Sequence, residues 1–332
     1  MKPVALTVCL ALLALPASAQ QSPAPADNVT VTGAREAAIA KFVETRAAAT
    51  RFAGKIARWQ SRICPMTYGI PPSYAKFVTD KLKEVAKAAG AKTTADPACK
   101  VNIQIVFTTS PQALMDNIRK EHPVYLGYHD NSTQAEQMTQ LKRPVHAFYT
   151  TQTADYRGNR QIDTKRRIGI GDVTFNSAPP IASAGTPGPD GSVGAIPDNA
   201  AGMVTMNLSG AVGMATSGTR FLGDGIQAEF NHIVIVVNTN KVIELEMGTL
   251  GDYIAMLALG QPERFDACQD LPSITNMMID PACPPATTVT AISPHDISYL
   301  QGLYKMSIAG ALNVQKSQIR YTMKQSAEGE AP

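Results

Sequence analysis

The sequence predicts an α+β fold in which helices pack against a mixed β-sheet. The first reason is the order helix, strand, helix between residues 71 and 118. The second is the strand-like segment at residues 230–238, whose centre at residues 233–237 is an unbroken apolar run, because such a run is typical of a central strand covered on both faces. The third is the apolar run at residues 253–260, which follows this strand and predicts a buried helix.

Two helices are expected in the amino-terminal third. Residues 35–59 are rich in Ala, Arg and Lys with few helix breakers, which predicts an amphipathic helix or a broken pair of helices. The polar face of this segment is basic, but it also carries Glu36 and Glu44. The next helix lies between the start signal at residues 71–73 and the stop at Gly90.

Strands are expected in the middle of the chain. Apolar residues alternate at residues 101–109 and predict a strand. Ser110, as N-cap, and Pro111, at the first helical position, then predict another helix. We expect further strands at residues 145–151 and 168–175.

The domain organisation follows from composition. Hydrophobic residues make up 44% of the chain, which supports one α+β domain over residues 35–325. The Ser, Pro, Ala and Gln residues that open the segment at residues 20–34 predict a disordered linker. This linker includes a short β-like run at residues 28–33. Residues 176–202 are dominated by Pro, Gly, Ala and Ser and predict a long flexible loop, and residues 326–332 predict a tail.

The amino terminus has the features of a signal peptide over residues 1–19. Lys2 supplies the positive charge, and the apolar run at residues 4–15 is too short to span a bilayer. Ala17-Ser18-Ala19 is a small-residue cleavage site. No other run predicts a transmembrane segment, so we expect a periplasmic or secreted protein.

The cysteine count agrees with export. Cys9 lies in the predicted signal peptide, which leaves Cys64, Cys99, Cys268 and Cys283. An even number of cysteines in an exported chain favours disulfides. The pairing Cys64–Cys99 and Cys268–Cys283 is favoured because each pair brackets one compact segment. The alternative is a four-cysteine zinc site, but no Cys-x-x-Cys pair is present, so no metal or other cofactor is expected.

Three motifs follow one another in the carboxyl-terminal quarter. The apolar helical run ends in Leu-Gly at residues 259–260, and residues 272–278 read Pro-Ser-Ile-Thr-Asn-Met-Met. Residues 293–304 then have the form Ser-x-x-Asp-Ile-x-x-Leu-Gln-x-Leu-Tyr. This order resembles metzincin-type metalloproteases, in which an active-site helix, a Met-turn and a closing helix succeed one another. The resemblance implies a zincin-like core.

The residues that zinc proteases use for catalysis are absent from these motifs. A zincin helix carries His-Glu-x-x-His, whose two imidazoles bind zinc and whose Glu polarises a water molecule. With Gly260 aligned to the glycine of that motif, the His positions hold Tyr253 and Leu257, and the Glu position holds Ile254. Thr275 stands where the turn should have Met. The resemblance therefore implies a degenerate catalytic motif, and an ordinary buried helix fits the same residues.

Two other motifs are similar to a group of exported proteins of Gram-negative bacteria. They are Arg-Trp-x-x-x-Ile-Cys-Pro at residues 58–65 and Leu-Gly-Asp-Tyr-Ile-Ala-Met-Leu-Ala-Leu at residues 250–259. This resemblance implies export and no particular activity.

Side chains capable of chemistry are dispersed. No two of the five histidines lie four residues apart, so the sequence contains no helical metal pair. His232, Glu229 and Asp252 are the candidate catalytic residues if folding assembles a hydrolase site. No Gly-x-Ser-x-Gly motif is present. Asp296 lies three residues after the expected cap Ser293, where it stabilises a helix start without any catalytic role.

Composition also bears on partners. The formal charge of +3 is close to neutral for this length and does not indicate a nucleic-acid partner. Our leading hypothesis is a non-catalytic exported domain that binds a protein or peptide in a zincin-like cleft. The alternatives are a hydrolase built from dispersed residues and an envelope-associated structural protein held by its basic amino-terminal helix. The oligomeric state is left open.

Overall fold

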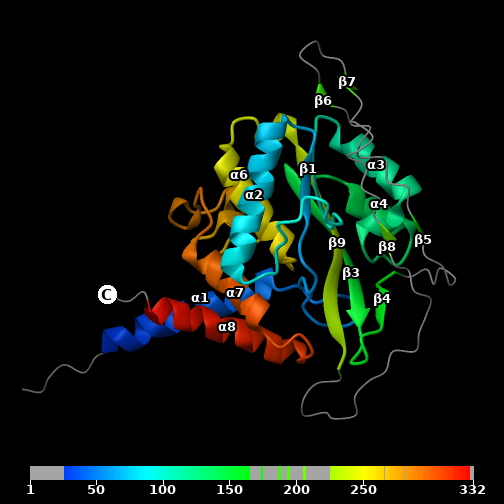
Figure 1. Ribbon diagram of the computed structural model, residues 1–332. Helices are drawn as coiled ribbons and strands as arrows, with labels where there is room; N and C mark the ends of the chain where they lie inside the picture. Colours follow the sequence, from blue (N-terminus) through cyan, green and yellow to red (C-terminus); the bar gives the residue numbers. More distant parts are fainter. Residues whose placement is uncertain are drawn as a thin grey trace, which may run out of the picture.

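A five-stranded mixed sheet with strand order β1-β2-β9-β3-β4 forms the centre of the computed structural model (Figure 1). β1 (Pro65–Tyr68), β2 (Ile103–Thr108) and β9 (Gln227–Asn238) run parallel to one another. β3 (Val145–Ala154) is antiparallel to β9, and β4 (Arg160–Ile162) is antiparallel to β3. The predicted α+β class with a mixed sheet is confirmed. The structure describes residues 26–164, 173–174, 186–187, 193–194, 205–206, 225–264, 266–279 and 281–329.

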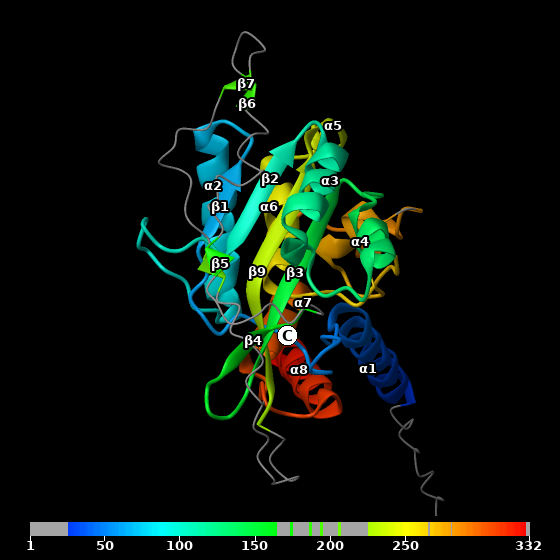
Figure 2. The same ribbon diagram turned by 90° about the vertical axis from the view of Figure 1, so that its right-hand side faces the viewer.

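Helices cover both faces of this sheet (Figures 1 and 2). One face packs against α2 (Pro72–Ala89), α6 (Met247–Leu259) and α7 (Pro294–Lys305). The other face packs against α3 (Pro111–Glu121), the 3₁₀ helix η1 (Pro123–Leu126) and α4 (Ser132–Thr139). β9 lies between them, with Ile233 and Ile235 facing α6 and Val234 and Val236 facing α3. This burial on both faces explains the unbroken apolar run at residues 233–237.

Helices α1 (Ala26–Arg46) and α8 (Leu312–Gly329) lie side by side at one end of the sheet (Figures 1 and 2). Two ion pairs join them, Lys316 with Glu44 and Lys324 with Glu36. α8 also packs on α7, where a Cβ at Gly302 would come within 2.9 Å of the Ile319 Cα. Glu36 and Glu44 of α1 therefore form ion pairs with α8.

Shorter elements complete the described part of the chain. They are α5 (Thr239–Val242), the 3₁₀ helices η3 (Ile274–Met278) and η4 (Pro285–Thr287), and the two-residue strands β5 (Val173–Thr174), β6 (Thr186–Pro187), β7 (Val193–Gly194) and β8 (Thr205–Met206). β5 pairs with β8, at one end of the strand predicted for residues 168–175, and β6 pairs with β7. The predicted signal peptide and most of the predicted loop at residues 176–202 lie outside the described residues.

The helices at the ends of the domain have other bounds than the sequence suggests. Residues 28–33, where a β-like run was expected, belong to α1, because the Ala-rich sequence that follows favours helix and elongation costs little once a helix exists. The first helix ends at Arg46 and does not extend to residue 59, because the chain turns back between Thr50 and Gly54. α8 continues to Gly329, so the predicted tail at residue 326 begins too early.

Most of the local signals for the other helices are confirmed. α2 ends at Gly90, whose φ of 86° is the left-handed conformation that glycine adopts at helix ends. α7 begins with a capping box in which Ser293 accepts from the Asp296 N–H and the Asp296 carboxylate accepts from the Ser293 N–H. α3 begins at Pro111 as predicted, although Ser110 makes no side-chain cap.

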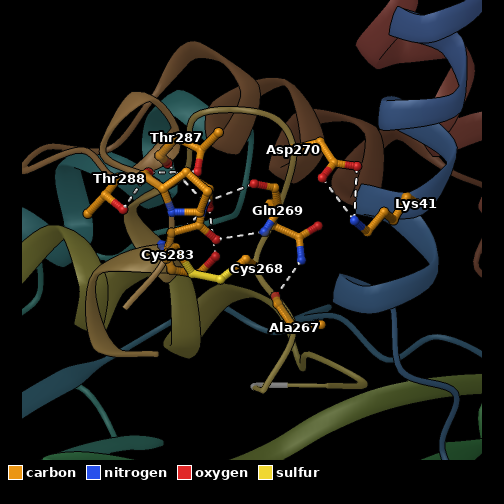
Figure 3. The surroundings of a disulfide bond; sticks show 12 residues. Lys41, Ala267, Cys268, Gln269, Asp270, Cys283, Thr287 and Thr288 are labelled. Atoms are coloured by element: carbon orange, nitrogen blue, oxygen red, sulfur yellow. Dashed lines mark hydrogen bonds and ion pairs between the residues drawn. A yellow bond between two sulfur atoms is a disulfide. The ribbon is translucent and has the colours of Figure 1, made fainter. Parts of the chain in front are cut away.

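Two disulfides join the predicted cysteine pairs, Cys64–Cys99 and Cys268–Cys283, with Cα atoms 6.0 and 5.6 Å apart. Figure 3 shows the second disulfide close to the ion pair between Lys41 of α1 and Asp270. Disulfides are typical of proteins outside the cytoplasm. No helix in the described ranges is long and apolar enough to cross a membrane.

Leu257→Ala should destabilise the fold because Leu257 is 1% exposed at the centre of α6. We expect a loss of about 2–5 kcal/mol in the free energy of unfolding, from lost burial and the cavity left behind. Val314→Ala on α8 is the matched control, since Val314 is exposed. Chemical denaturation measures both variants, and equal losses would contradict the burial of α6.

Candidate functional site

The carboxyl end of α6 is buried, and its carbonyl groups are capped by aromatic side chains. The last carbonyls of a helix have no partner within the helix. Here the Tyr149 hydroxyl donates to the Leu257 carbonyl at 2.9 Å. The Trp59 indole N–H donates to the Ala258 carbonyl, also at 2.9 Å.

A third aromatic residue completes the cap. The Tyr304 hydroxyl donates to the Leu259 carbonyl at 3.1 Å, and the Tyr149 hydroxyl also lies 3.4 Å from the Gly260 carbonyl. The three donors come from β3, from the segment before β1 and from α7. The end of α6 is therefore fixed against three separate parts of the chain.

The positions that correspond to the zinc motif are closed to solvent. Tyr253 is 2% exposed, and Ile254 and Leu257 are also buried. Burial raises the pKa of Tyr253 to about 12, so its hydroxyl stays protonated at neutral pH. A protonated phenol and two aliphatic side chains supply neither metal ligands nor a general base.

Asp296 connects the turn η3 to the closing helix α7. Its carboxylate accepts hydrogen bonds from the Ser273 hydroxyl at 2.6 Å and from the Ile274 N–H at 2.9 Å, in addition to its bond within the capping box. Burial raises the pKa of Asp296, and these hydrogen bonds partly oppose that effect. Both carboxylate oxygens of Asp296 therefore accept hydrogen bonds, and these bonds hold η3 against the start of α7.

A cavity of about 350 Å³ lies along the outer side of β3, close to the end of α6. From the α6 side it is lined by Ala49, Thr50, Arg51, Tyr149, Gln261 and Pro262. From the α3 side it is lined by Leu126, Tyr128, Met138, His146 and Phe148. We call this cavity the β3 groove.

The backbone of β3 presents hydrogen-bonding groups to this groove. Ile233 of β9 donates its N–H to the Asn102 carbonyl, on the side away from β3. Its cross-strand partner Tyr149 therefore points its own main-chain groups away from β9, and Ala147, two residues earlier, does the same. On this outer side Thr151 accepts from the Asp163 N–H, which confirms the alternation.

The outer edge is open only over part of β3. β4 pairs with residues 152–154 alone. Gly127 lies against the Tyr149 carbonyl, where a Cβ would come within 2.2 Å of the oxygen. Within the described chain, nothing is hydrogen-bonded to the main-chain N–H or carbonyl of Ala147 on this side. The open edge thus runs from Val145 to the Tyr149 N–H.

The walls of the β3 groove contain further polar groups. The Thr50 hydroxyl and the Gln261 Oε1 are buried and have no hydrogen-bond partner among the described residues. Arg51 pairs with Asp130 at 2.6 Å and lies 5.8 Å from the centre of the Tyr128 ring, so it links the two walls.

His146 lies in the α3-side wall of the groove and is neutral at physiological pH. Its Nε2 accepts from the Arg143 N–H at 2.8 Å. Burial, together with the charges of Arg143 and Lys241, lowers the pKa of His146 to about 4. His146 therefore does not change its protonation state near pH 7.

The proposed hydrolase residues are only partly brought together. Glu229 accepts hydrogen bonds from the Gln152 amide at 2.7 Å and the Arg160 guanidinium at 3.1 Å. The His232 ring lies 5.0 Å from the ring of Tyr125, on the α3 side of the sheet. Asp252 lies in α6, on the opposite side of the sheet from this ring.

The partners of Asp252 explain its burial without catalysis. It pairs with Lys81 of α2 at 3.4 Å and accepts from the Ile292 N–H at 3.1 Å. His232 and Asp252 are therefore separated by the sheet. Across the described part of the chain, no group of three or more His, Cys, Asp or Glu residues could hold a metal ion.

Comparisons with protein-family models, curated proteins and solved structures gave no match to this chain. Its function is therefore inferred from the geometry given above.

Tyr149→Phe should destabilise the protein without changing the shape of the core. It removes the donor to the Leu257 and Gly260 carbonyls and leaves them buried without that partner, at a cost of about 1–3 kcal/mol. Tyr156→Phe is the control, because the Tyr156 side chain is 49% exposed. Denaturant unfolding compares the two, and a Tyr149→Phe protein as stable as the control would contradict the capping role.

Proposed function

We propose that this protein is an exported domain with a zincin-like core that has lost catalysis and binds an extended peptide or protein segment in the β3 groove. The observation that carries this proposal is the open main-chain edge of β3 inside a cavity. An exposed strand edge is a template for another strand, and proteins usually protect it with charges, Pro or covering elements. Here the Ala147 backbone is left accessible between two walls.

Binding would proceed by addition of a strand to the sheet. The Ala147 N–H and carbonyl and the Tyr149 N–H would pair with the main chain of the partner, which supplies affinity without sequence preference. Successive side chains of the added strand point to opposite faces. One set would contact the apolar wall formed by Leu126, Met138 and Phe148, and the other set would contact the Thr50 hydroxyl and Gln261.

The zincin-like part of the proposal is supported by the order and packing of three elements. α6, η3 and α7 follow in the sequence expected for an active-site helix, a turn and a closing helix. η3 packs against α6, and Asp296 joins it to α7. The apolar side chains at positions 254 and 257 support the loss of catalysis.

The compartment is part of the same proposal. The two disulfides favour an oxidising environment. Together with the signal-peptide features at residues 1–19, they support a periplasmic or secreted location.

Ala147→Pro should weaken strand addition while leaving the sheet intact. Proline removes an N–H that faces away from β9, and proline is tolerated on strand edges at such positions. Peptides of about ten residues, the length of a long strand, would be selected from a random phage-displayed library. Their fluorescein-labelled forms would be titrated by fluorescence polarisation, and we expect Ala147→Pro to weaken binding by about tenfold or more, ~1.4 kcal/mol.

The matched control is Ala147→Val, which keeps the N–H and should bind as the unaltered protein does. Peptides recovered after incubation should be intact, as expected for a site without catalytic groups. Equal binding by Ala147→Pro and Ala147→Val would contradict strand addition. Cleavage of the bound peptide would favour the hydrolase alternative.

A further inference from the structure

Two buried polar groups on the α6 side of the β3 groove have no hydrogen-bond partner among the described residues. They are the Thr50 hydroxyl and the Gln261 Oε1, and both residues line the groove. Thr50 is only 5% exposed. Nearly all buried polar groups in proteins are hydrogen-bonded, so two unpartnered groups in one cavity wall indicate a position that a ligand completes.

The fold holds both residues in place through their main chains. The Gln261 carbonyl accepts from the Ala48 N–H at 3.0 Å, and the Thr50 N–H donates to the Lys55 carbonyl at 2.8 Å. The Gln261 side-chain amide, by contrast, makes no hydrogen bond within the described part of the chain. Turning this amide into the groove therefore breaks no hydrogen bond.

The charge of the groove favours a neutral ligand group at this wall. Among the described residues that line the groove, Arg51 alone is charged at neutral pH, and Asp130 pairs with it at 2.6 Å. An ammonium group buried beside Thr50 and Gln261 would find no carboxylate among the lining residues. Burial of an unpaired charge is costly, so lysine side chains are disfavoured there.

On the basis of the peptide binding proposed above, we infer that the β3 groove selects segments with Asn or Gln at the position that faces Thr50 and Gln261. A side-chain amide has two N–H donors and one acceptor oxygen. It can pair with the Gln261 amide through two hydrogen bonds and still donate its second N–H to the Thr50 hydroxyl. A serine or threonine hydroxyl has one donor and cannot donate to both oxygens.

The opposite wall sets the chemistry of the neighbouring positions. Successive side chains of an added strand point to opposite faces, so the residues on either side of the amide residue face Leu126, Met138 and Phe148. These apolar side chains favour apolar partners. The segment that the groove selects therefore has the order apolar, amide, apolar. A site that hydrogen-bonds a ligand group discriminates against an analogue that lacks the group, because its own polar groups are then left unpaired.

The test uses fluorescein-labelled peptides selected from the random library on the unaltered protein. We expect one position to hold Asn or Gln between apolar residues. Replacing that residue by Leu should weaken binding by about tenfold, the effect of about two ordinary hydrogen bonds. In a double-mutant cycle, Gln261→Leu should weaken binding of the amide peptide similarly and bind the amide and Leu peptides within about twofold of each other.

The matched control is Gln325→Leu, which replaces an exposed glutamine of α8 and should keep the full preference for the amide peptide. Gln261→Leu should fold normally because the Gln261 side chain makes no hydrogen bond, and its binding of the Leu peptide would verify this. Equal binding of both peptides by the unaltered protein, or a preference that persists in Gln261→Leu, would overturn this inference.

Failure of the inference is distinguishable from failure of the proposed function. If Ala147→Pro weakens binding of both peptides while the amide preference is absent, strand addition stands and the inference falls. If no peptide is selected, or Ala147→Pro weakens binding of neither peptide, the proposed function falls, and the inference that rests on it falls too.

Discussion

Burial of the carboxyl end of α6 is the constraint on which the rest of the structure depends. This helix has no polar face along residues 253–259, so it must be covered on all sides. A buried helix end is costly unless its carbonyl groups find donors. Tyr149, Trp59 and Tyr304 supply them, and in doing so they fix β3, the segment before β1 and α7 around one point. The same arrangement places the chain after α6 beside the edge of β3, which creates the groove.

Part of this fold could be predicted from the sequence. The strand β9, the buried helix α6 and the capping box of α7 are encoded by local patterns, namely an apolar run, a second apolar run and the Ser293/Asp296 pair. The disulfide pairing followed from sequence proximity. The end of α1 was not predictable in this way, because the turn after Arg46 depends on contacts with distant segments, such as the Ala48 N–H bonded to the Gln261 carbonyl.

Less of the candidate sites could be predicted from the sequence. The open edge of β3 follows from strand order, which no local pattern gives. The aromatic donors to α6 lie far from it in sequence, with Tyr149 108 residues from Leu257. Glu229 and His232 were suggested by their place on the central strand, and a cavity does open beside Asn231 and His232. Asp252 was grouped with them only because the sequence did not indicate on which side of the sheet each residue lies.

Hydrogen exchange at the edge of β3 tests the central claim most directly. The amide protons of Ala147 and Tyr149 face the groove, whereas that of Phe148 points toward β9. In the complex with a selected peptide, strand addition predicts strong new protection of the Ala147 and Tyr149 amides and little change at Phe148. Unchanged exchange at Ala147 and Tyr149 in a saturated complex would contradict the proposal that this edge is the binding site.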